Sequence, residues 1–163
     1  MTQRERFIKT LKCEPIGGQV PTFELVFFLT MEAFGRVHPS QRYFGQWNQM
    51  SKTEQNLHIQ DMADLYIQTA RRYGHGAIFI HPNPGGFEWT QRLLEAIRQE
   101  SGDEYYIMMH GDVTHSIPDG EHMVDFSVMM FEEPEKLNDQ SQRWLDANLE
   151  LARKLDDAGH LLD

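Results

Sequence analysis

Cysteine is nearly absent from this chain of 163 residues, and long apolar runs are missing altogether. The single cysteine, Cys13, excludes a disulfide within the chain and any metal site built on paired cysteines. No apolar stretch approaches the ~20 residues that span a bilayer, and the polar residues 1–6 lack the apolar segment of a signal peptide. We therefore expect a cytoplasmic protein with no membrane partner.

Positive charge is scarce in the second half of the chain. The net charge is −10, and residues 81–163 hold six Lys and Arg against eighteen Asp and Glu. Residues 1–80 hold nine against seven, so the two halves carry about −12 and +2. A polyanion would be repelled by the acidic half, which excludes nucleic acid as an expected partner.

Glycine-rich phosphate-binding motifs of the GxGxxG or Walker type are also missing. What is present is an alternation of short apolar runs with helical periodicity, which is typical of parallel βαβ units. Capping boxes at Thr2–Glu5 and Ser51–Glu54 mark two helix starts, and Gly74 marks a helix end. We predict strands near 20–27, 77–81 and 105–110, and helices over 3–12, 52–73, 88–101, 121–131 and 134–158.

Several segments, in order, resemble the uroporphyrinogen decarboxylase superfamily, which also contains corrinoid-dependent methyltransferases. The matching stretches are residues 4–11, Glu14-Pro15, Val20-Pro21, 70–74, 77–80, 110–120 and 131–135. The resemblance implies an α/β fold that is part of a (β/α)8 TIM barrel, with about three parallel strands and flanking helices. It implies that residues 1–163 form one domain, the N-terminal half of such a barrel, because family members are about twice as long.

Five side chains are candidates for the site because they lie in or after the expected strands, and barrel chemistry occurs at strand carboxyl ends. Glu24, His81 and His110 are the candidate catalytic residues, and Asp112 and His115 the candidate substrate-binding residues. Imidazoles and carboxylates on one rim can act as general acids and bases. The ordinary alternatives are an ion pair for Glu24, a loop hydrogen bond for His81 and a turn cap for Asp112.

No metal site is expected in this chain. His110 and His115 have the spacing of a ligand pair, but no third ligand accompanies them. In the methyltransferase branch of the superfamily that this chain resembles, the zinc ligands lie in the C-terminal half. The resemblance therefore implies zinc and a corrinoid only for a full-length relative, with a small molecule, a corrinoid protein or a C-terminal half as partners.

Three functions remain open at this point. The first is a methyltransferase-like enzyme portion that supplies substrate-pocket residues and is inactive alone. The second is a non-catalytic truncated or split-gene fragment that folds by self-association, and a homo-oligomer is expected because the predicted sheet has open edges. The third is uroporphyrinogen decarboxylase itself. The resemblance argues against it, because the arginine pair and the aspartate of that enzyme fall here at Val26, Thr30 and His81-Pro82.

Overall fold

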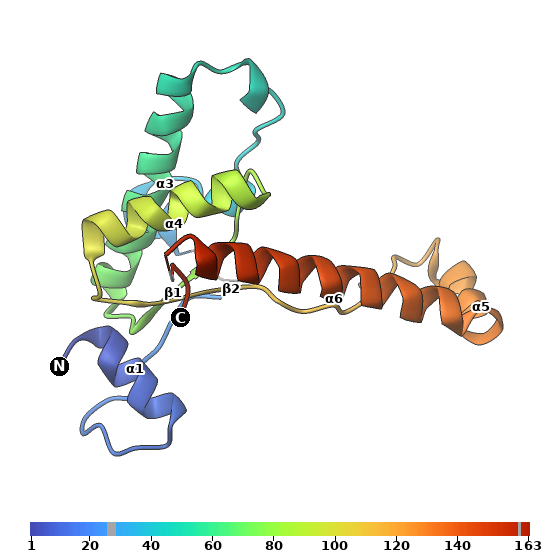
Figure 1. The fold of residues 1–163 in the computed structure, drawn as a ribbon, viewed down its shortest axis with the longest axis horizontal. Helices are drawn as coiled ribbons and strands as arrows, with labels where there is room; N and C mark the ends of the chain where they lie inside the picture. Colours follow the sequence, from blue (N-terminus) through green and yellow to red (C-terminus); the bar gives the residue numbers. More distant parts are fainter. Residues whose placement is uncertain (26–28, 160) are drawn as a thin grey trace. The chain divides into compact units, whose positions relative to one another are not determined.

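The computed structural model describes residues 1–25, 29–159 and 161–163, and this part of the chain is mostly helical (57%). Its contacts divide the chain into two compact units. The first unit contains residues 1–110 and 155–163, and the second contains residues 111–154. Figure 1 labels the helices and strands of both units.

The first unit contains both strands and most of the helices of the described residues. They are α1 (Gln3–Leu11), α2 (Thr30–Phe34), η1 (Pro39–Gln41), η2 (Trp47–Gln49), α3 (Lys52–Tyr73), β1 (Ala77–Ile80), α4 (Phe87–Ser101) and β2 (Tyr106–Met109). Both predicted capping boxes are formed, by Thr2 and Glu5 for α1 and by Ser51 and Glu54 for α3. Gly74 ends α3 in the left-handed conformation, at φ 66°, which glycine adopts without a steric penalty.

The sheet consists of β1 and β2, which pair in parallel from Ala77 opposite Tyr106 to Ile80 opposite Met109. Helix α4 connects them, so β1–α4–β2 is a βαβ unit (Figure 1). Alternate residues of the strands, Ile78, Ile80 and Ile107, are at most 3% exposed. They belong to the core together with buried residues of α3 and α4, which pack against each other. The predicted parallel pairing of these two strands is confirmed.

The prediction of about three parallel strands in a partial TIM barrel is wrong. Residues 20–25 form no strand, and residues 26–28 of the predicted strand 20–27 lie outside the described residues. Pro21 has no N–H group to donate to a strand ladder. The carbonyl oxygen of Thr22 accepts one hydrogen bond from the N–H of Gly76, at 2.8 Å, and the carbonyl oxygen of Leu25 lies 2.9 Å from Nε2 of His81. The sheet of the described chain therefore has two strands.

The outer edge of β2 is covered by Asp163. Its N–H donates to the carbonyl oxygen of Ile107 at 3.0 Å, and its carboxylate accepts from the Ile107 N–H at 2.8 Å. The same carboxylate, with a side chain 3% exposed, pairs with Arg4 of α1 and Arg98 of α4. One carboxylate thus joins two helices to the sheet.

The second unit contains α5 (Met123–Glu132) and the part of α6 (Pro134–Asp157) up to residue 154. Pro134 occupies the first turn of α6, where its missing N–H costs no hydrogen bond. No residue of α5 is fully buried. Among the helices of the described residues, none has the length and apolar character needed to cross a membrane.

Candidate functional site

The carboxyl end of the two-stranded sheet brings His81 and His110 together. Ile80 and Met109 are opposite each other in the parallel register, and they are followed directly by His81 and His110. Side chains alternate along a strand, so Phe79 and His81 share a face with Met108 and His110. The imidazole centroids of His81 and His110 are 5.2 Å apart. The two histidines predicted to be catalytic are therefore neighbours.

The Phe79 ring contacts both imidazoles. Its ring centroid is 5.2 Å from that of His81 and 4.7 Å from that of His110. The His81 Nε2 atom lies 2.9 Å from the carbonyl oxygen of Leu25. A carbonyl can only accept, so Nε2 of His81 carries the proton. Burial lowers the pKa of His81 below its ordinary value, which keeps this imidazole neutral at pH 7.

A third imidazole, His38, lies beside His81 and was not predicted from the sequence. The two ring centroids are 5.5 Å apart, and His38 is 4% exposed. Its Nδ1 accepts from the Ser40 N–H at 3.2 Å, so a neutral His38 carries its proton on Nε2. Burial, with smaller contributions from His81 and Arg42, lowers the pKa of His38 to about 4. The sequence signal was His38 before Pro39, a cap position ahead of a helical turn.

Ion pairs place the segment that carries His38 on α3. Arg36 pairs with Asp61 and Asp64, at 2.6 and 2.8 Å, and Arg42 pairs with Asp61. Arg42 also donates to the carbonyl oxygen of Val37 at 3.0 Å. Both guanidinium groups therefore have carboxylate partners, which reduces the charge that they offer to a ligand.

Tyr66 and Asn83 position the loop that begins at His81. The Tyr66 hydroxyl accepts from the His81 N–H at 3.0 Å, and burial raises the pKa of Tyr66 far above its ordinary value. The Asn83 amide donates to the carbonyl oxygens of Pro39 and Arg42, both at 2.8 Å. Neither residue was predicted. In the sequence, Tyr66 is one of the apolar positions of a predicted helix, and Asn83 is a residue of a predicted loop.

Glu24 lies close to this cluster but outside a strand. It lines a cavity of about 10 Å³ with Tyr66 and Phe79, which is about the room of one water molecule. Burial raises the pKa of Glu24, and the N–H of Leu29, which donates to its carboxylate, opposes that rise. The pairing of Glu24 with a cation, the ordinary alternative, is not seen among the ion pairs of the described residues.

Asp112 and His115 belong to the second unit, whereas His81 and His110 belong to the first. The His115 Nε2 atom lies 2.9 Å from the Ser141 hydroxyl oxygen and 3.1 Å from the carbonyl oxygen of Leu137, and its ring packs on Trp144 at 4.8 Å. The Asp112 backbone carbonyl accepts from the Asn148 amide at 3.0 Å. Within their unit, the contacts of both residues hold the 111–120 segment against α6.

The described residues contain no group of three or more His, Cys, Asp or Glu side chains arranged to hold a metal ion. Comparisons with protein-family models, with curated proteins and with solved structures gave no significant match.

Proposed function

We propose that the carboxyl edge of β1 and β2 is the substrate pocket of an enzyme of the uroporphyrinogen decarboxylase superfamily, of the methyltransferase-like kind. The observation that carries the proposal is the juxtaposition of His81 and His110, 5.2 Å apart, at the ends of two parallel strands. Open parallel sheets bind ligands at this edge. The superfamily assignment comes from the sequence resemblance alone.

The chemistry of this edge suits a small substrate that gives up a proton. His110 is exposed and can reach a ligand, while His81 and His38 are held by backbone contacts and are neutral at pH 7. A thiol that accepts a methyl group must lose its proton, and a neutral imidazole can accept that proton. We assign this role to His110, with His81 and His38 as positioning residues.

The same edge is poorly suited to the polycarboxylate substrate of uroporphyrinogen decarboxylase. Such a substrate calls for guanidinium forks that are available to bind carboxylates. Arg36 and Arg42 are already paired with Asp61 and Asp64. Of the two positions that correspond to the enzyme's arginines, Thr30 is 1% exposed and Val26 lies outside the described residues. Purified protein should therefore not convert uroporphyrinogen above a heat-killed control.

A thermal-shift screen with thiols, corrinoids and porphyrins, each with and without zinc, tests the proposal on the full chain. A ligand at 100 times its Kd stabilises the native state by about 2.7 kcal/mol, which raises Tm by roughly 5–11 °C for a protein of this size. We expect a thiol or corrinoid to give such a shift, and His110→Gln to remove it. His122→Gln, an exposed histidine of the second unit, is the matched control and should keep it.

Two results would count against this function. A shift that is the same in wild type and in His110→Gln would place the ligand elsewhere. The absence of any shift, together with concentration-dependent association in light scattering, would favour the non-catalytic fragment that folds by self-association.

A further inference from the structure

The outer face of α5 is exposed and apolar within the second unit. Val124, Val128 and Phe131 recur at helical spacing and are 69%, 47% and 88% exposed. With Gly120 and Met123 they line an open groove of about 560 Å³. Monomeric proteins rarely leave such continuous apolar surface uncovered, so this face calls for an occupant.

The opposite side of α5 is apolar as well. Phe126 and Met129 are half-buried, and the Phe126 ring is 6.4 Å from the ring of His115. Asp125 and Glu132 are the only charged residues in the ten residues of the helix. A helix with apolar residues on two faces is typically covered on both, and the second unit covers only one of them.

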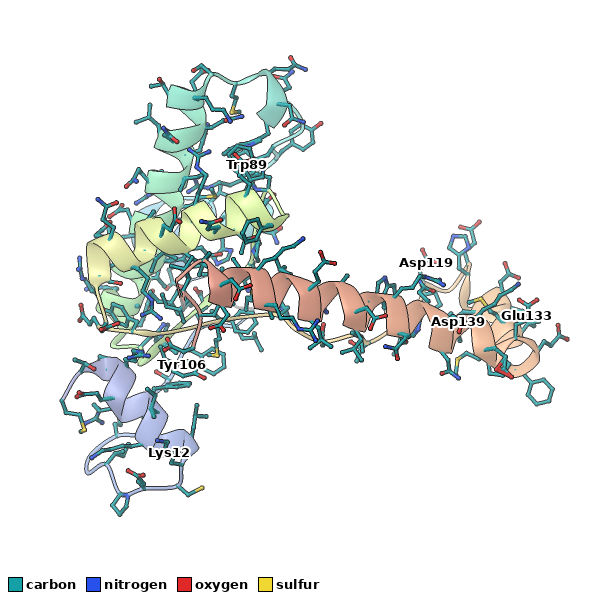
Figure 2. The ribbon with its side chains drawn as sticks, viewed as in Figure 1. Lys12, Trp89, Tyr106, Asp119, Glu133 and Asp139 are labelled. Atoms are coloured by element: carbon teal, nitrogen blue, oxygen red, sulfur yellow. The ribbon has the colours of Figure 1, made fainter. Side chains whose placement is uncertain are left out.

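The segment that carries α5 is strongly acidic. Residues 119–135 contain no lysine or arginine and six carboxylates, which are Asp119, Glu121, Asp125, Glu132, Glu133 and Glu135. Asp119 precedes the first turn of α5 and Glu133 follows its last turn (Figure 2). Glu133 is paired with Lys136, the first cation after this stretch. An apolar floor with an anionic rim selects an apolar partner with a cationic rim.

We propose that the α5 groove binds a cationic amphipathic helix from another protein, with its apolar residues on Val124, Val128 and Phe131 and its Lys or Arg residues toward the carboxylates. An amphipathic helix in an apolar groove is a recurrent mode of peptide recognition, and methionines such as Met123 and Met130 adapt to varied partners. A second copy of the chain is a poorer occupant for face-to-face packing, because six carboxylates would meet six. An anionic membrane surface would be repelled for the same reason.

The test uses the full chain and two labelled synthetic helices of about 18 residues, long enough to form helix in water. Both have leucines at positions i, i+3, i+4 and i+7. The other positions combine alanine with lysine in one and alanine with glutamate in the other, because a continuous run of like charges would destabilise the helix. Fluorescence anisotropy should give at least tenfold tighter binding for the lysine helix. The double variant V128S/F131S should lose at least tenfold in affinity for it. Leu57→Ser, at an α3 residue that is 64% exposed, should leave the affinity unchanged.

A second pair of variants separates the groove from the acidity of the whole chain. D125N/E132Q neutralises two carboxylates on α5 and should weaken binding several-fold. E14Q/E32Q neutralises two exposed carboxylates of the first unit and should have a clearly smaller effect. Equal losses for the two pairs would show unspecific attraction and overturn the proposal.

Four other results would also overturn it. Equal affinity for the two helices would mean general stickiness. A fall in Tm of V128S/F131S as large as that of a core variant would mean that the chain itself covers this face. Self-association that disappears in V128S/F131S, or binding to vesicles of mixed zwitterionic and anionic lipid, would identify a second copy or a membrane as the occupant.

Discussion

Removal of the Asp163 carboxylate should destabilise the first unit clearly, because this group makes several contacts at once. It lies 2.5 Å from an Arg4 nitrogen and 2.7 Å from an Arg98 nitrogen, and it also accepts the Ile107 N–H. The Asp163 side chain is 3% exposed, that of Arg98 14% and that of Arg4 33%. Asp163→Ala would leave one nearly buried guanidinium and one strand N–H without this acceptor.

The expected loss follows from that geometry. Removing one partner of a buried ion pair costs about 3–5 kcal/mol, and the lower end applies because Arg4 can regain water. We therefore expect Asp163→Ala to lower the free energy of unfolding by about 3 kcal/mol, and Tm by roughly 6–12 °C. Asp163→Asn keeps one acceptor oxygen but loses the charge, so about 2 kcal/mol is expected.

The pH dependence gives an independent check on the same residue. Desolvation acts to raise the pKa of Asp163, but the bonds from Arg4, Ile107 and Arg98 together outweigh it and leave the pKa lowered. Because the folded state then binds its proton less readily than the unfolded state, the stabilisation is present above the unfolded pKa of about 3.9 and is lost as the pH falls below it. The difference between wild type and Asp163→Asn should shrink between pH 5 and pH 3.

Urea unfolding followed by tryptophan fluorescence measures both effects. Asp157→Asn, an exposed carboxylate of α6 close to the same chain end, is the matched control and should change stability by less than about 0.5 kcal/mol. A loss below about 1 kcal/mol for Asp163→Ala, or a difference that stays constant with pH, would refute the reasoning.

The remaining predictions concern the site and the start of α3. Because burial lowers the pKa of His38 to about 4 from 6.5, wild-type stability should fall as the pH is lowered from about 6.5 to 4, and His38→Gln should flatten that profile in urea unfolding at several pH values. Tyr66→Phe removes the acceptor of the His81 N–H and should cost about 1 kcal/mol in the same assay, with a shifted His81 amide resonance; an unmoved resonance would contradict this contact. Ser51→Ala removes the capping box of α3, so it should lower the free energy of unfolding by about 1 kcal/mol and speed amide exchange in the first turn of α3. Ser141→Ala, which removes no cap, should leave amide exchange in that turn unchanged.

The parts of the fold that could be predicted from the sequence are those with local causes. The capping boxes at Thr2 and Ser51 and the stop at Gly74 lie within a few residues of the backbone groups that they satisfy. The predicted strands 77–81 and 105–110, with a helix between them, correspond to the parallel pair β1 and β2 at 77–80 and 106–109. That pairing is enough to bring His81 and His110 to one edge, because parallel strands end on the same side.

The tertiary structure decided the features that depend on distant partners. Residues 20–25 have the composition of a strand, but a strand exists only where a neighbour meets its N–H and C=O groups, and Pro21 removes one of them. His38 became part of the site because Arg36 and Arg42 pair with carboxylates of α3 that lie 19 to 28 residues further along the chain. Ion pairs at such separations leave no periodic signal in a sequence, and the same holds for Asp163 and Arg4. The sequence alone determined the helices and the sheet edge with its two histidines, and only the folded chain determined which other side chains stand beside them.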